Sequence, residues 1–449
     1  MRVVRMFGAA LMVAAALGPA WPDGRAGASP GRGGAIAARG TMNQVTPDPR
    51  GEFTPLTPAR VLDTRTGLGT SASGPRLIGP GETLDVQIAG RGGVPASGAS
   101  AVVFNATLAS TSTTSWLAVF PAGGSVPFVS NLNYSPGSEV ANMVTVALGD
   151  GGQVGVFNAA GQVHVVLDVV GYYADAGGPL GARFLGVSPQ RAFDTRGGIG
   201  GVPAQPLGPG GVLHFDVTGV AGVPASGVTA VVVNLTAVQP TSPTWLAVYP
   251  DDVARPDASS LNLQAGTTVP NLVTVRVPAS GVIDVFNAAG FTHVIGDVMG
   301  YYTTQVVTNE GRFIPVVPQR VFDSRIGDLS RLGVKLPGGV SHITTLDRNA
   351  ELAATGATAA VLNVTVTEPD NDGWLAVFPG DDCTFPSSSN LNYTFHQTIP
   401  NSVVTRLASL FQCEGSGPNT FALYTTWGTH VVVDLFGYFT KPDFVFGGG

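Results

Sequence analysis

The sequence predicts an all-β protein made of three tandem antiparallel β-sandwich modules that are jelly-roll-like. The 449-residue chain repeats itself with a period of about 130 residues, and each repeat separates short segments rich in Val, Phe and Thr by turns that contain Gly or Pro. No repeat shows the long 3.6-residue apolar period of an amphipathic helix, so strands are the expected elements. A repeat of this length can bury its own core, and we expect about eight strands in each.

The repeats correspond to residues 53–173, 184–302 and 313–440. Each opens with Arg-x-x-Asp-(Thr/Ser)-Arg, continues through Trp-Leu-Ala-Val-(Phe/Tyr)-Pro and an Asn-Leu-Asn-like segment, and closes with a strand that runs from His to two aromatic residues. The connectors "ADAGGPLGAR" and "TTQVVTNEGR" join the modules. Tethers this short allow the modules to pack side by side around a pseudo-threefold axis, but a string of separate modules fits them equally well.

The N-terminus has the pattern of a secretory signal peptide, assigned to residues 1–28. Arg2 and Arg5 precede a short apolar run, and small residues then offer cleavage after Ala20 or after Ala28. Residues 29–52 are rich in Gly, Ala and Pro and are expected to form a flexible leader. No later apolar run reaches the roughly 18 residues of a membrane span. The expected location is therefore outside the cell, either free or associated with the cell wall.

The two cysteines, Cys383 and Cys413, both lie in the third repeat. In an exported chain an isolated pair predicts a disulfide. Closing a loop of this length would stabilise the fold by roughly 3 kcal/mol in the chain-entropy model. A metal site is the alternative, but the neighbourhood supplies too few ligands, and no metal or other cofactor is expected.

The closing strand of each repeat carries a carboxylate between apolar residues. In the first repeat, Val165, Leu167 and Val169 alternate with His164, Val166, Asp168, Val170 and Tyr172, so both faces of the strand are largely apolar and the strand is predicted to be central. A buried carboxylate needs a partner, and the opening motif supplies arginines. The predicted ion network contains Arg60, Asp63, Arg65, Asp168, Arg191, Asp194, Arg196, Asp297, Arg320, Asp323, Arg325 and Asp434.

Strand alternation places Asp63 and Arg65 on one face of the opening strand and Arg60 on the other. The favoured interpretation is a structural network that joins the two ends of each module. The alternative is that Asp63 and Arg65 contact a polar ligand such as a sugar or a carboxylate. A catalytic acid–base pair is disfavoured because an Arg neighbour lowers the pKa of a carboxylic acid, which is the wrong direction for a general acid.

The tryptophans of the Trp-Leu-Ala-Val segments have two interpretations: Trp116, Trp245 and Trp374 are either core residues of the sandwich, which is favoured, or a platform for sugar rings. The Asn-Leu-Asn segments likewise either contact a glycan or satisfy the backbone of a turn. Their residues are Asn131, Asn133, Asn262, Asn390 and Asn392.

The Pro-x-Arg-Val-x-Asp-Thr-Arg opening and the His-Val-x-x-Asp-Val-x-Gly-Tyr-Tyr ending resemble a repeated module of secreted and cell-envelope proteins from high-GC Gram-positive bacteria. Copies of that module occur in tandem, sometimes beside cell-wall hydrolases. The resemblance covers nearly everything after residue 52 and implies an envelope location without an established reaction. The third repeat departs from the pattern, with Ser324 in place of Thr, and Tyr424 matching Asn158 and Asn287.

The chain contains no Gly-x-Ser-x-Gly elbow, Walker loop or His-Glu-x-x-His motif. The net charge of -7 is spread without a basic stripe, so nucleic acid is not an expected partner. We expect a secreted, non-enzymatic surface protein that acts in adhesion, as a scaffold or in surface binding, its partner being a cell-wall or extracellular polymer or another surface protein. The alternatives are a carbohydrate-binding protein and, last, a hydrolase with a site between modules. The sequence does not define the oligomeric state.

Overall fold

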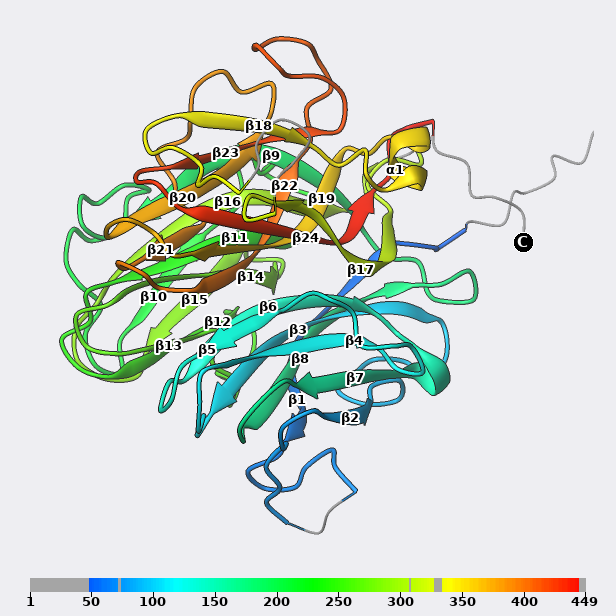
Figure 1. Ribbon diagram of the computed structural model, residues 1–449, viewed down its shortest axis with the longest axis vertical. Helices are drawn as coiled ribbons and strands as arrows, with labels where there is room; N and C mark the ends of the chain where they lie inside the picture. Colours follow the sequence, from blue (N-terminus) through cyan, green and yellow to red (C-terminus); the bar gives the residue numbers. More distant parts are fainter. Residues whose placement is uncertain (1–47, 72–73, 307, 327–332, 444–449) are drawn as a thin grey trace, which may run out of the picture. The chain divides into compact units, whose positions relative to one another are not determined.

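In each module, the strands form two antiparallel sheets (Figure 1). This computed structural model describes residues 48–71, 74–306, 308–326 and 333–443. The predicted signal peptide and residues 29–47 of the predicted leader lie outside the described residues. Within the described residues, each module contributes eight strands.

The strands of module 1 are β1 (Phe53–Asp63), β2 (Glu82–Gln87), β3 (Ala99–Ala109), β4 (Ser115–Pro121), β5 (Leu132–Tyr134), β6 (Val140–Ala147), β7 (Gln153–Asn158) and β8 (His164–Ala174), with a short 3-10 turn, η1 (Asp150–Gly152), before β7. The strands of module 2 are β9 (Arg183–Asp194), β10 (Val212–Asp216), β11 (Val228–Val238), β12 (Thr244–Pro250), β13 (Leu261–Leu263), β14 (Thr268–Arg276), β15 (Val282–Asn287) and β16 (His293–Thr303). Module 3 consists of β17 (Phe313–Asp323), β18 (Ser341–Thr345), helix α1 (Ala350–Thr355), β19 (Ala359–Thr367), β20 (Gly373–Pro379), β21 (Leu391–Tyr393), β22 (Ile399–Arg406), β23 (Thr420–Thr425) and β24 (His430–Phe439).

The strand order is that of a jelly roll. In module 1 the sheets are β1-β8-β3-β6 and β2-β7-β4-β5, so the first strand pairs with the eighth, the second with the seventh, the third with the sixth and the fourth with the fifth. This is the pattern of a long hairpin rolled into a two-sheet sandwich. Modules 2 and 3 repeat the order. The predicted fold class is therefore confirmed. We call the sheet that contains the opening strand the axial sheet, and the other the peripheral sheet.

The closing strand β8 lies between β1 and β3 and is buried along almost its whole length, as its two apolar faces predict. Its alternation is broken near Gly171: Val103 pairs with Gly171 but Phe104 pairs with Val169, which leaves Val170 as the extra residue of a bulge. Tyr172 therefore belongs to the core of module 1, whereas Tyr173 belongs to the core between modules. The prediction that Tyr172 shares a face with Asp168 is wrong for this reason.

The axial sheets of the three modules pack against one another, so of the two arrangements that the sequence allows, the side-by-side one is observed. A core cluster draws buried residues from all three modules, including the opening Phe and the last aromatic residue of each. These rings stack pairwise in cyclic order, with centroid distances of 4.3 Å for Phe53–Tyr302, 4.4 Å for Phe184–Phe439 and 4.3 Å for Phe313–Tyr173. The arrangement has pseudo-threefold symmetry.

Buried asparagines repeat the same cyclic order. In each case an Asn of the sixth strand of one module donates from its side-chain amide to the side-chain oxygen of an Asn of the third strand in the preceding module. The pairs are Asn271 to Asn105 at 3.0 Å, Asn401 to Asn234 at 3.3 Å, and Asn142 to Asn363 at 3.0 Å. Because these amides are desolvated, each bond specifies the register of one module on the next.

The last residues of the predicted leader are part of the fold. Glu52 is buried, and its carboxylate lies 3.1 Å from the guanidinium groups of both Arg183 and Arg312. Glu52, Arg183 and Arg312 each directly precede the opening Phe of a module. The carboxylate of Glu52 therefore joins the beginning of module 1 to the beginnings of the other two modules. Phe313 N also donates to Gly51 O at 2.8 Å. Gly51 and Glu52, which were predicted to belong to the flexible leader, are therefore part of the fold.

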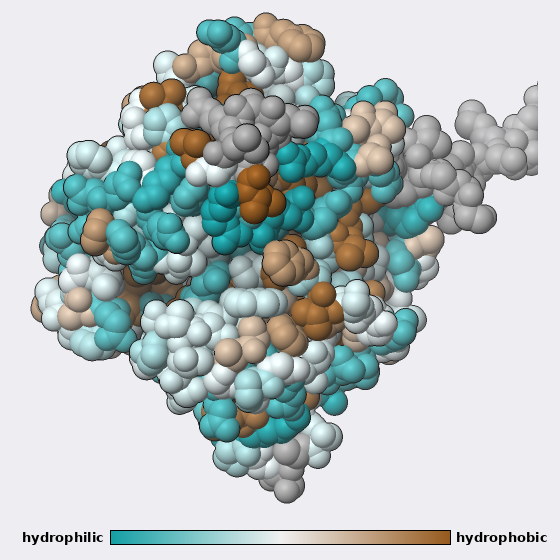
Figure 2. All heavy atoms as spheres, in the orientation of Figure 1, coloured by the Kyte–Doolittle hydropathy of each residue, from teal (hydrophilic) through white to brown (hydrophobic). Residues whose placement is uncertain are grey.

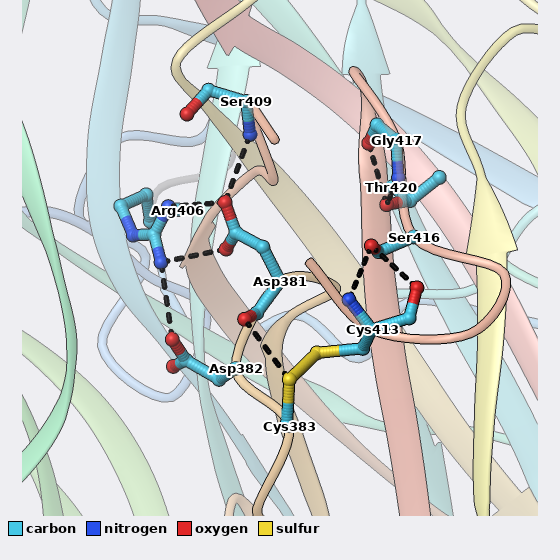
Figure 3. The surroundings of a disulfide bond; sticks show 9 residues. All are labelled: Asp381, Asp382, Cys383, Arg406, Ser409, Cys413, Ser416, Gly417 and Thr420. Atoms are coloured by element: carbon cyan, nitrogen blue, oxygen red, sulfur yellow. Dashed lines mark hydrogen bonds and ion pairs between the residues drawn. A yellow bond between two sulfur atoms is a disulfide. The ribbon is translucent and has the colours of Figure 1, made fainter. Parts of the chain in front are cut away.

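The predicted disulfide between Cys383 and Cys413 is present, with Cα atoms 5.4 Å apart (Figure 3). It joins the loop after β20 to the loop after β22. Beside it, Asp381 binds Arg406 at 2.8 Å and accepts a hydrogen bond from Ser409 N at 3.0 Å (Figure 3). Arg406 ends β22, so the disulfide and this ion pair anchor the same two loops of module 3.

Candidate binding clefts at the module boundaries

The opening motif forms an ion network that joins the first and last strands of each module. In module 1, Arg60 donates to the two carboxylate oxygens of Asp168 at 2.9 and 3.2 Å and lies 3.4 Å from Asp63. Arg65 donates to the two oxygens of Asp63 at 2.9 and 2.8 Å. The same contacts join Arg191, Asp194, Arg196 and Asp297 in module 2, and Arg320, Asp323, Arg325 and Asp434 in module 3.

The two carboxylates of the network differ in their surroundings. Burial disfavours the charged form of Asp63, but its hydrogen bonds from Arg65 outweigh burial and lower its pKa. Asp168 is almost completely enclosed, and burial raises its pKa although Arg60 acts in the opposite direction. The pairs Asp194 and Asp297, and Asp323 and Asp434, show the same two directions of pKa shift.

The prediction that Arg60 points away from Asp63 is wrong. The register between β1 and β8 shifts between Arg60 and Leu62, because Arg60 pairs with Asp168 whereas Leu62 pairs with Leu167. This irregularity interrupts the alternation of side chains, so the side chains of Arg60 and Asp63 lie on the same side of the strand and contact each other. A pattern of residue types does not reveal such a bulge, so strict alternation misplaced one arginine in each module.

Sequence reasoning missed the role of the hydroxyl residue between Asp and Arg. Thr64 Oγ1 accepts a hydrogen bond from Val165 N at 2.9 Å and lies 3.0 Å from His164 Nδ1. Ser324 makes the same contacts with Val431 N and His430, at 2.9 and 3.1 Å. The signal was present in the sequence, since only Thr or Ser occupies this position and each closing strand begins with His. The hydroxyl holds the closing strand against the opening strand.

The three tryptophans are half-buried, so the favoured interpretation as core residues is wrong. Leu117 and Val119 of β4 point into the core of module 1, and Trp116 faces the outer side of the peripheral sheet. Trp116 packs there against Phe157, with ring centroids 5.3 Å apart. Trp245–Phe286 and Trp374–Tyr424 repeat the contact at 5.2 and 5.1 Å. An aromatic surface therefore remains accessible in each module.

The third repeat aligns differently from the sequence-based match. Tyr424 pairs with Ala376 as Phe157 pairs with Ala118, so Tyr424 is the counterpart of a Phe. Thr425 occupies the place of Asn158. The match of Tyr424 with the asparagines is therefore wrong by one position, because in that segment only the strand pairing distinguishes the two alignments.

The asparagines of the Asn-Leu-Asn segments divide into two groups. Asn131 and Asn390 are buried, and each accepts a hydrogen bond from the backbone of the neighbouring strand, at 2.7 Å from Val119 N and 2.6 Å from Val377 N. They satisfy the backbone. The asparagines two positions later are half-buried and each accepts from a serine hydroxyl at 2.8 to 3.0 Å; these are Asn133, Asn262 and Asn392. Only this second group is available to a ligand.

The structure brings the arginine motif of one module beside the tryptophan and the accessible asparagine of another. At the boundary of modules 1 and 2, a cleft of about 290 Å³ contains Arg60, Arg65 and Glu139 of module 1 together with Trp245 and Asn262 of module 2. We call it the 1/2 cleft. At the boundary of modules 3 and 1, a cleft of about 180 Å³, the 3/1 cleft, is lined by Arg320, Arg325, Trp116, Phe128, Val129, Ser130 and Asn133. Motifs that are far apart in each repeat are therefore neighbours across a boundary.

The boundary itself is held by the loop between the fourth and fifth strands. The Arg60 guanidinium donates to Asp257 O of module 2 at 2.6 Å, and Arg191 donates to Ser387 O of module 3 at 3.2 Å. At the remaining boundary, the guanidinium of Arg320 lies 5.7 Å from the centre of the Phe128 ring. The first arginine of each opening motif therefore binds the carboxylates of its own module and also contacts the next module.

The fold and these clefts define the protein as a jelly-roll repeat protein whose three modules close into a ring. No family model and no curated protein matches the chain. A solved structure described as "The Triple Jelly Roll Fold and Turret Assembly in an Archaeal Virus" matches over 87% of this chain and 91% of its own, with 9% identity and a TM-score of 0.17. A superposition as loose as this supports no functional argument, and the jelly-roll assignment rests on the strand order described above. Among the described residues, no helix has the length and apolar character of a membrane span.

Proposed function

We propose that this protein is a secreted, non-enzymatic surface-binding protein that attaches to a cell-wall or other extracellular polymer through its module-boundary clefts. The observation that carries the proposal is the juxtaposition of a half-exposed tryptophan with the arginines of another module, as with Trp245 beside Arg60 and Arg65. Ligand sites commonly combine an aromatic surface with a few convergent polar groups.

The chemistry of the clefts favours binding over hydrolysis. Although burial disfavours its charged form, hydrogen bonds from Arg65 lower the pKa of Asp63 and keep it ionised, so it is a poor proton donor. Burial raises the pKa of Asp168, but this carboxyl group is almost completely enclosed and both of its oxygens accept hydrogen bonds from Arg60, so a substrate does not reach it. The hydroxyl of Thr64 already accepts a backbone hydrogen bond, which occupies it structurally. A location outside the cell agrees with the disulfide in module 3.

The repeated clefts favour a polymer over a small ligand. A polymer that carries many identical units can occupy more than one cleft at once, and each further contact gains from high effective concentration. The face in Figure 2 shows apolar residues in small groups among polar ones. Attachment through local clefts fits such a surface better than attachment through one broad apolar area.

The experiment is retention of the full chain on insoluble material. The purified protein is mixed with isolated bacterial cell wall, cellulose, chitin and insoluble mannan, and the bound fraction is measured after sedimentation. We expect retention on at least one polymer, and loss of most of it in the triple variant Trp116→Ala, Trp245→Ala, Trp374→Ala. Phe291→Ala removes an exposed aromatic ring that lies outside both described clefts and serves as the matched control.

The melting temperature of each variant shows whether the fold is intact. Retention that is unchanged in a folded triple variant would exclude the clefts as the binding sites. No retention on any of the four polymers, combined with capture of a protein from the cell surface, would replace a polymer by a protein as the partner.

A further inference from the structure

We infer that each cleft is one composite site for an uncharged, hydroxyl-rich segment of a glycan chain, and that successive modules share these sites in cyclic order. This inference rests on the proposed function and specifies its ligand class and the composition of its sites.

The composite character follows from the origin of the lining residues. In the 1/2 cleft, Arg60, Arg65 and Glu139 come from module 1, whereas Trp245, Arg255 and Asn262 come from module 2. Asn262 Nδ2 lies 3.4 Å from a carboxylate oxygen of Glu139, so the two polar side chains meet across the boundary. In the 3/1 cleft, Arg325 comes from module 3 and Trp116 from module 1. In both clefts the arginines of the opening motif and the tryptophan come from different modules.

The uncharged ligand follows from the charge balance. In the 3/1 cleft the two guanidinium groups of Arg320 and Arg325 face the two carboxylates of Asp323 and Asp434, so the charges cancel. A carboxylate or phosphate ligand would have to compete with carboxylates that already bind both guanidinium groups through paired hydrogen bonds. In the 3/1 cleft a polyanion would therefore replace existing ion pairs without adding new ones. In the 1/2 cleft the additional guanidinium of Arg255 is accompanied by the additional carboxylate of Glu139, which opposes an anionic ligand.

The side-chain groups that remain available in the clefts can form hydrogen bonds with the hydroxyl groups of a glycan. The side chains of Arg65 and Arg325 are each 45% exposed while they hold their aspartates, so N–H groups outside the ion pair can donate to a hydroxyl oxygen. Glu139 is exposed in the 1/2 cleft and can accept a hydrogen bond from a hydroxyl. In the 3/1 cleft the half-exposed Trp116 offers an apolar ring against which the C–H face of a sugar packs. In the 1/2 cleft the guanidinium of Arg255 lies 5.6 Å from the centre of the Trp245 ring, so the sugar would contact the part of that ring that Arg255 leaves exposed.

The volumes of the clefts limit the length of glycan chain that each cleft can contact. Volumes of about 290 and 180 Å³ lie at or below the lower end of the range of about 300–1,000 Å³ that is typical of small-molecule sites. Each cleft therefore contacts a short segment of a chain, and tight attachment requires several clefts on one polymer.

The first test compares soluble probes by affinity electrophoresis of the full chain. Galactomannan and hydroxyethyl cellulose serve as uncharged probes, and polygalacturonate and alginate as anionic ones. We expect retardation by an uncharged probe, with an apparent Kd that changes less than about twofold between 50 and 500 mM NaCl, because no charge pair forms on binding. Retardation by the anionic probes alone, weakened about tenfold or more by salt, would overturn the uncharged ligand while leaving the proposed function intact.

The second test counts sites by isothermal titration with oligosaccharides released from the retained polymer. Glu139→Ala and Trp245→Ala come from different modules but from the same cleft, so each single variant and the double variant should lose one site. Glu139→Ala combined with Trp116→Ala affects two clefts and should lose two sites.

Arg65→Ala replaces Glu139→Ala in a parallel series, and melting temperatures identify variants that are misfolded. Loss of two sites in the same-cleft double variant would show that each module has a complete site of its own. Absence of binding to every probe and polymer would instead contradict the proposed function itself.

Discussion

Arg60 and Asp168 stand 108 residues apart in the chain, at opposite ends of module 1, and meet in a two-point ion pair between β1 and β8. The same guanidinium group also reaches Asp257 O of module 2 at 2.6 Å. One side chain therefore joins the beginning of a module to its end and to the next module.

Replacement of Arg60 by Ala should lower the free energy of unfolding by about 3 kcal/mol, because it leaves the carboxylate of Asp168 buried without its partner. Urea unfolding followed by tryptophan fluorescence measures the effect. Arg91→Ala, which removes an exposed arginine, is the control and should change the free energy by less than about 0.5 kcal/mol. Equal urea midpoints for the two variants would contradict a structural role for the network.

The contribution of Asp63 should depend on pH in the acid range. Its pKa is lowered in the folded protein from the ordinary 3.8, so the stabilisation is complete above pH 3.8 and is lost as the pH falls through the folded pKa. The difference in unfolding free energy between the wild type and Asp63→Asn should be constant from pH 8 to about pH 5 and shrink below about pH 4. Urea unfolding at pH 7, 5 and 3.5 checks this. A difference that grows toward low pH would show that the sign is wrong.

The buried hydroxyls of Tyr173 and Tyr302 share a hydrogen bond of 2.5 Å, and module 3 has Phe439 at the equivalent position. Tyr302→Phe leaves the hydroxyl of Tyr173 desolvated without a partner and should cost about 1–3 kcal/mol. The double variant with Tyr173→Phe should recover most of this loss, since the last aromatic position of each module would then be Phe, as it is in module 3. Thermal melting of the two variants tests the prediction, and a double variant that is less stable than the single one would refute it.

Loss of the disulfide should destabilise module 3 by about 3 kcal/mol, because the bond closes a loop with a sequence separation of 30 residues. The variant in which both Cys383 and Cys413 are replaced by Ser should melt earlier than the wild type in the absence of reductant. Dithiothreitol should lower the melting temperature of the wild type and leave that of the variant unchanged. A reductant effect of equal size on both proteins would indicate another cause.

Much of the module could be predicted from the sequence because the side chains along most of its strands alternate between the two faces of a sheet. The apolar alternation of β8 predicts a central strand, and it lies between β1 and β3. The prediction failed where the backbone departs from that period. The bulge near Gly171 directs Tyr173 rather than Tyr172 toward the axis, and a side chain at Gly171 would collide with the ring of Phe53, 2.2 Å from its Cζ. The glycine in the closing motif therefore makes room for that ring, which only the fold could show.

The composite clefts could not be derived from one repeat considered alone. Each repeat contains both the arginine motif and the tryptophan segment, which suggests that they belong to one site. The structure pairs Arg65 with Trp245 and Arg325 with Trp116, because the modules contact one another in cyclic order. The preference for Trp116 as a core residue failed for a related reason: the aromatic ring packs on the outer face of its sheet against a single neighbouring ring. Composition does not distinguish that position from the interior.

The cyclic Asn and aromatic contacts also bear on how such a chain arises and persists. A head-to-tail contact that closes after three copies is the geometry of a homotrimer, and a gene for one module could have produced the same ring from separate subunits. Fusion into a single polypeptide removes the dependence of that ring on protein concentration. It also allows the copies to differ: module 3 has a helix and a disulfide, and it has Phe439 where modules 1 and 2 have the hydrogen-bonded pair Tyr173 and Tyr302.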